Sequence, residues 1–163
     1  MKPFRLLLTV LSLGVIFSFS GCSGGGGAAE STPDKQFGML SAKTWTASTV
    51  TLNGVDQSST WTGFKLKISG TKGASTFSYN TTTGTRPALG PWPAGNNIGG
   101  LGTWAFGTDP VTQITRDPGA ANDELPMTYT VTATTLTISF NYTGAGYAAR
   151  VSNLSGNWVF NFN

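Results

Sequence analysis

Alternating apolar and polar residues predict an all-β fold, an eight-stranded antiparallel up-and-down barrel. From residue 39 onward, short runs place apolar side chains at every second position and are rich in threonine, valine, isoleucine and aromatics. This pattern is typical of strands with one buried face, and no stretch keeps a sustained helical period. The connections are short enough to join every consecutive pair as a hairpin, and closure removes exposed edges. A two-sheet β-sandwich is the alternative that the pattern allows.

Eight strands are expected, each bounded by glycine, asparagine or proline. In the second, Phe64, Leu66 and Ile68 alternate with two lysines, so that one face is apolar and the other charged. The strands are expected at residues 44–52, 63–69, 75–80, 102–106, 111–116, 127–132, 136–142 and 156–162.

The side chains expected to point inward are mostly aromatic. An eight-stranded barrel is only just wide enough to be filled by side chains or to hold one small ligand. The sequence therefore leaves two possibilities: a solid core of side chains, or a cavity that holds a ligand. The inward set is Trp45, Phe64, Phe77, Tyr79, Trp104, Phe106, Tyr129, Phe140, Tyr142, Trp158, Phe160 and Phe162.

The connections alternate between short and long. Turns near residues 70–74, 107–110 and 133–135 are short, whereas residues 53–62, 81–101, 117–126 and 143–155 form long connections. In an antiparallel meander these two sets lie at opposite ends. One end is thus expected to be closed and the other to carry four loops, which is where binding usually resides.

The first 37 residues indicate a lipid anchor and a tether. Residues 1–21 read as a lipoprotein signal peptide, with a basic start, an apolar run over residues 6–19, and Cys22 directly after it. The run is shorter than the roughly 20 residues that a membrane-spanning helix needs. Cys22 is expected to carry lipid, residues 22–37 to form a flexible glycine-rich tether, and residues 38–163 to form the β domain.

Composition excludes several classes of protein. The chain has no histidine and one cysteine, which removes histidine-dependent nucleophilic catalysis, histidine-ligated zinc and internal disulfides. Without residues 1–21, eight basic and seven acidic residues leave a net charge of +1, which gives no reason to expect nucleic acid as a partner. No cofactor and no metal are expected, and the protein is expected not to be an enzyme.

Four residues of the long connections are candidate ligand contacts: Trp61, Trp92, Tyr147 and Arg150. Trp92 lies between two prolines, and an aromatic ring held in this way loses little entropy when it stacks on a sugar or a partner. The other interpretation is that Trp61 and Trp92 fold inward and cap the barrel.

The domain resembles the lipocalin-like lipoproteins of Bacteroidota. The resemblance rests on Trp45, Asn53-Gly54, residues 102–106, residues 136–140 and residues 155–160. Lys43 stands where lipocalins carry the glycine of their Gly-x-Trp opening. The resemblance implies a calycin-type barrel that binds a small apolar ligand and has no catalytic residues.

The expected function is therefore that of a non-catalytic lipoprotein, anchored in the bacterial outer membrane and facing the periplasm or the surface. It is expected to bind a small apolar ligand at the looped end. The alternative is a surface module that binds a glycan or a protein through its loop aromatics.

Overall fold

The computed structural model describes residues 29–82, 91–92, 101–121, 123–143 and 154–163. Cys22, the signal segment, Tyr147 and Arg150 lie outside these residues, so lipidation of Cys22 stays a prediction. The described elements are α1 (Thr32–Ser41), β1 (Thr44–Leu52), β2 (Val55–Asp56), η1 (Ser58–Trp61), β3 (Lys65–Ser69), β4 (Phe77–Thr82), β5 (Leu101–Phe106), β6 (Gln113–Arg116), β7 (Leu125–Val131), β8 (Leu136–Tyr142) and β9 (Gly156–Phe162).

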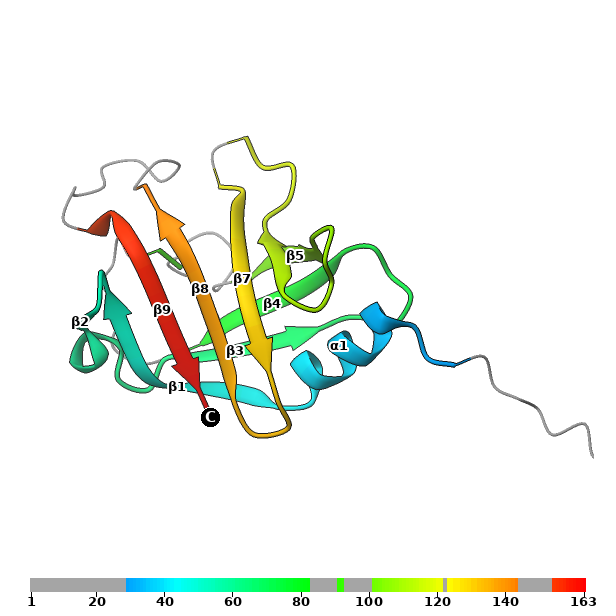
Figure 1. Ribbon diagram of the computed structural model, residues 1–163, viewed down its shortest axis with the longest axis horizontal. Coiled ribbons are helices and arrows are strands. Elements are labelled where there is room, and N and C mark those ends of the chain that lie inside the picture. Colours follow the sequence, from blue (N-terminus) through cyan, green and yellow to red (C-terminus); the bar gives the residue numbers. More distant parts are fainter. Residues whose placement is uncertain (1–28, 83–90, 93–100, 122, 144–153) are drawn as a thin grey trace, which may run out of the picture.

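The strands form one antiparallel sheet that closes on itself (Figure 1). Neighbours follow the order of the chain from β3 to β9, and β1 pairs with both β3 and β9. The eight-stranded up-and-down barrel is confirmed, and the single closed sheet excludes the two-sheet sandwich. The ninth strand, the short β2, is an addition that pairs with the end of β1 across the Asn53-Gly54 turn.

The antiparallel order separates the two kinds of connection as predicted. We call the end with the β3–β4, β5–β6 and β7–β8 turns the closed end. Strand β1 starts there, since Thr44 pairs with Lys67 near the end of β3. The ends of the strands that the long connections join lie at the opposite end, which we call the loop end. The first described residues reach the closed end too, where Glu30 forms an ion pair with Lys72 in the β3–β4 turn.

A helix replaces part of the predicted tether. Residues 32–37 were expected to be flexible, but α1 begins at Thr32 with Ser31 as its N-cap, whose hydroxyl accepts from the Asp34 amide at 3.2 Å. Phe37 and Leu40 are buried in the core. The tether boundary at residue 37 is therefore wrong, because these two apolar side chains gain enough burial to order the turn around them. No helix in the described part of the chain is long and apolar enough to cross a membrane.

Trp45 joins α1 to the barrel. Its indole Nε1 donates to the Leu40 carbonyl at 2.7 Å, and Lys43 Nζ lies 4.6 Å from the centre of its ring. The Lys43 ammonium also donates to the Thr134 carbonyl in the β7–β8 turn at 3.0 Å. These contacts fix the helix across the closed end.

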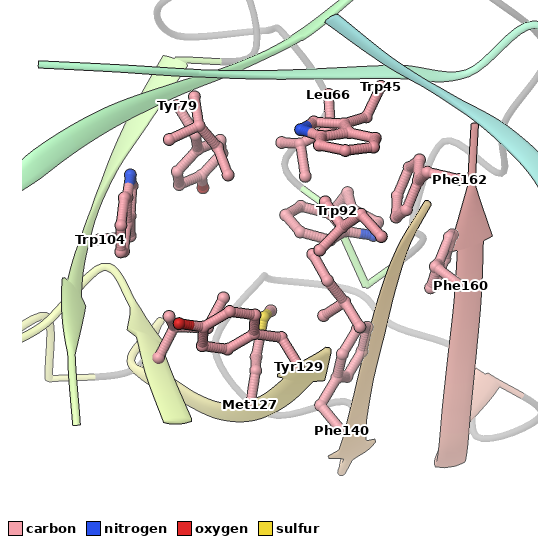
Figure 2. Packing of buried hydrophobic residues seen from close by; sticks show 14 of the residues in the cluster. Trp45, Leu66, Tyr79, Trp92, Trp104, Met127, Tyr129, Phe140, Phe160 and Phe162 are labelled. Atoms are coloured by element: carbon pink, nitrogen blue, oxygen red, sulfur yellow. The ribbon is translucent and has the colours of Figure 1, made fainter. Parts of the chain in front are cut away.

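Aromatic rings fill the barrel. Eleven of the twelve side chains predicted to point inward are buried, and Phe106 is partly buried against the same cluster. Phe160 stacks on Phe140 at 5.9 Å between ring centres and meets the edges of Trp61 and Trp92 at 4.8 and 5.9 Å. Figure 2 shows Trp92 in the middle of this packing. The solid core, one of the two open possibilities, is the one observed.

Replacing Leu40 with alanine tests whether α1 belongs to the folded domain. Because Leu40 is fully buried, the variant should lose about 3 kcal/mol of unfolding free energy, as large-to-small core changes do. Urea unfolding followed by tryptophan fluorescence measures it. Lys35→Ala, on the exposed side of α1, is the control and should change stability by less than about 0.5 kcal/mol. Equal effects for both variants would mean that α1 is not part of the core.

Tyr129 should make the protein less stable in alkali. Its phenol donates to the Pro110 carbonyl at the closed end, and burial, with a further contribution from the Asp109 carboxylate, raises its pKa. The neutral phenol is thus favoured in the folded state, so its contribution is complete below about pH 10 and is lost as the unfolded chain ionises above it. Urea unfolding at about pH 9 and pH 11 should show a smaller loss for Tyr129→Phe than for the unaltered protein; an equal loss would contradict this assignment.

Candidate functional site

The barrel wall is open between β7 and β8 at the loop end. Pairing between these strands runs from Val131↔Leu136 to Thr128↔Ser139. Beyond it, within the described residues, positions 125–127 pair with β6 alone and positions 140–142 with β9 alone. Figure 1 shows the two strands meeting at their turn and diverging toward the loop end. We call this opening, lined by residues 125–127 and 140–142, the seam.

Pro126 explains why the pairing stops. Successive residues of a strand direct their amides to opposite neighbours. The Tyr129 amide donates to the Thr112 carbonyl on the β6 side at 2.8 Å. The amide positions of residues 128 and 126 therefore face β8. Position 126 is opposite Asn141 in the register of the two strands, but proline has no amide hydrogen to donate. A strand proline is a signal of an edge or an interrupted ladder, and it could have identified the seam from the sequence.

Two hollows adjoin the seam. On the outer face, a groove of about 460 Å³ is lined by Gly107, Gln113, Ile114, Thr115, Pro126, Met127, Thr128, Ser139, Phe140, Asn141 and Asn157. At the loop end, a hollow of about 220 Å³ is lined by Arg116, Ala121, Asp123, Glu124, Leu125, Tyr142 and Thr143. Adjacent residues of the same strands line different hollows: those of β6, β7 and β8 that line the outer groove are next to those that line the loop-end hollow. Both hollows therefore lie along the seam. We call them the outer hollow and the loop-end hollow.

Arg116 is a buried charge beside the seam. It is 3% exposed, and its Nε lies 3.2 Å from Asp117 Oδ2. Asp117 also accepts from the Tyr79 hydroxyl at 2.9 Å and from the Thr103 amide at 2.9 Å. The two opposite charges compensate each other, and Asp117 is well supplied with hydrogen bonds, whereas the buried Arg116 Nε makes an ion contact without a hydrogen bond of its own among the described residues.

The guanidinium of Arg116 also contacts residues 91–92, a segment that fills part of the barrel interior and that we call the plug. It donates to the Pro91 carbonyl and, at 3.3 Å, to the Asp123 carbonyl, and it lies 5.9 Å from the Trp92 ring. The same side chain thus joins β6, the plug and the β6–β7 loop. Sequence reasoning did not single out Arg116, although its position two residues after Ile114 places both side chains on the inward face of β6.

Trp61 and Trp92 are core residues rather than exposed contacts. They are 1% and 3% exposed, which contradicts the alternative in which both rings stack on an external glycan or protein. Each ring completes the packing around Phe160. The interior beside Trp92 keeps a cavity of only about 20 Å³, which is room for about one water molecule. Tyr147 and Arg150, the other two candidates, lie outside the described residues.

Asp123 offers an acceptor to a ligand. It lines the loop-end hollow, and its buried Oδ1 has no hydrogen-bond partner among the described residues. A buried acceptor of this kind usually receives a donor from water or a ligand. No group of three or more acidic, cysteine or histidine side chains within the described ranges is arranged to hold a metal ion.

Comparison of the chain with protein-family models, with curated proteins and with solved structures gave no match. The assignment of the candidate site therefore rests on the geometry of the barrel.

Arg116→Met tests the buried pair. The variant leaves Asp117 without its cation and the Pro91 carbonyl without its donor, so we expect a loss of about 3 kcal/mol in unfolding free energy. A second replacement, Asp117→Asn, should add much less to this loss than it costs alone, because the two groups act together. Lys67→Met, an exposed lysine of β3, is the control. Strictly additive effects in urea unfolding would show that the pair is not coupled.

Proposed function

We propose that this protein is a non-catalytic, lipid-anchored binding protein of the bacterial outer membrane, with a lipocalin-like barrel that takes a small, partly apolar ligand at the loop end. The observation that carries the proposal is the seam. There the wall is interrupted by Pro126, and the two hollows give access to the apolar side chains behind it.

The size of the hollows supports a ligand at the wall rather than in the barrel centre. Ligand pockets usually measure about 300–1,000 Å³, and the outer hollow, at about 460 Å³, falls within this range. The central cavity of about 20 Å³ does not. The expectation of an apolar ligand enclosed by the barrel is thus revised, and the ligand is assigned to the seam.

The lining indicates the chemistry of the ligand. Ile114, Met127 and Phe140 give the outer hollow an apolar floor, while the polar side chains among its described lining residues carry hydroxyl and amide groups and no charge. The loop-end hollow adds the unpartnered Asp123 oxygen. A ligand that fits both has an apolar body, uncharged hydrogen-bonding groups and at least one donor.

Native mass spectrometry of the full chain, purified in mild detergent from a bacterium that produces it, tests the proposal. We expect a retained small molecule on the unaltered protein. Ala121→Phe, which fills the loop-end hollow from an exposed position, should reduce its occupancy about tenfold, since overpacking of a site costs on the order of 1–3 kcal/mol. Ala133→Phe makes the same change in the β7–β8 turn and should leave occupancy unchanged.

Pro126→Thr separates binding from folding. Threonine supplies the amide that proline lacks, so the β7–β8 ladder can extend to Asn141 and narrow the seam. We expect stability equal to or above that of the unaltered protein together with weaker ligand retention. An empty unaltered protein, or undiminished ligand on both Ala121→Phe and Pro126→Thr, would refute a site at the seam.

A further inference from the structure

Every lysine that the structure describes lies on or beside α1 and β3. Lys35 is on α1, Lys43 directly precedes β1, Lys65 and Lys67 are on the outer face of β3, and Lys72 is in the β3–β4 turn. Helix α1 contacts β3, and β1 pairs with it, so these elements form one continuous surface that runs from the closed end onto the wall. We call it the lysine surface.

The charges of the described residues are divided between the two ends. Near the closed end, Lys35, Lys43, Lys67 and Lys72 face three carboxylates, those of Glu30, Asp34 and Asp109, which leaves +1. Toward the loop end, Arg116 and Lys65, the first residue of β3, face Asp56, Asp117, Asp123 and Glu124, which leaves −2. Lys72 is paired with Glu30, whereas the ion pairs within the described residues do not involve Lys35, Lys65 or Lys67.

The chain leaves the domain beside the lysine surface. Glu30 contacts Lys72, and the Asp34 carboxylate accepts from the Gly73 amide at 2.7 Å, so the first described residues are held against the β3–β4 turn. Cys22 is seven residues before Ala29. Seven extended residues span at most about 25 Å, and α1 removes the longer reach that a tether to residue 37 would have allowed.

We propose that the lysine surface docks on a bilayer that contains anionic phospholipid, with the loop end pointing away from it. The proposal rests on the lipid anchor at Cys22, because the short linker keeps the lysines near the headgroups. Surface charges act over about 8–10 Å at physiological ionic strength. Each lysine that reaches an anionic surface strengthens binding about fivefold, so the three lysines without an ion-pair partner together favour the docked orientation about 100-fold.

The test uses the full chain, purified in detergent and inserted into preformed vesicles of phosphatidylcholine, either alone or mixed with phosphatidylglycerol. A membrane-impermeant amine reagent modifies exposed lysines, and peptide mass spectrometry measures the rate at each position. On mixed vesicles, modification of Lys35, Lys65 and Lys67 should be about tenfold slower than on phosphatidylcholine alone, and high salt should abolish the difference. A lysine placed at the loop end by Val55→Lys, where the valine is 62% exposed, should react at one rate on both vesicles.

Two matched double variants show whether the lysines cause the docking. Lys65→Ser with Lys67→Ser, and Val55→Glu with Leu101→Glu, each change the net charge by two units at exposed positions, the first pair on the lysine surface and the second at the loop end. The first should remove the protection of Lys35, and the second should keep it. Equal modification on both kinds of vesicle, or protection that survives high salt, overturns the proposal.

Flotation of the same samples distinguishes this surface from the anchor. Flotation with both kinds of vesicle but no protection of the lysines refutes the surface and leaves the anchor intact. Flotation with mixed vesicles alone supports the surface and refutes the anchor, and the mass of the purified chain shows independently whether Cys22 carries acyl groups. Flotation with neither refutes both.

Discussion

The packing of aromatic rings around Phe160 decides what this barrel can do. Phe160 lies on β9, the strand that closes the sheet against β1, and it meets rings from η1, β8 and the segment at Trp92. An eight-stranded barrel encloses little more than the volume of its own side chains. Because these rings occupy that volume, the fold cannot hold a ligand at its centre without losing the contacts that close it. A ligand, if the protein takes one, would therefore have to bind where the packing ends.

The seam is such a place, and its origin is local. Proline withdraws one donor from the ladder at position 126, and the strands on either side remain paired to their other neighbours. The wall can open there because the sheet is held by β6–β7 on one side and β8–β9 on the other. Arg116 then fixes the edge of the opening to the Pro91–Trp92 plug, so the opening in the wall and the filling of the interior are physically joined.

The bounds of a strand could be predicted from the sequence where strict alternation of apolar and polar residues was the main signal. The strands at residues 44–52, 136–142 and 156–162 have the predicted bounds, because strict alternation ends there in turn-forming residues. Helix α1 was missed because only Phe37 and Leu40 of its ten residues are buried, too few to give a helical period beside a glycine-rich tract, although Ser31 and Pro33 are start signals. For Trp92, flanking prolines fit an exposed ring and a buried ring equally well. Only tertiary contacts, with Phe160 and with Arg116, distinguish the two positions.

Helix α1 also links the two proposals. A tether that ended at residue 37 would let the barrel turn freely, whereas a helix docked through Trp45 and Leu40 fixes the point at which the chain leaves the closed end. The seam widens in the opposite direction, toward the loop end, where carboxylates outnumber cations among the described residues. With the lysine surface on the bilayer, the two hollows face water. A ligand would then arrive from the aqueous side, and its uncharged hydrogen-bonding groups would serve to keep it soluble before it reaches the apolar floor of the seam.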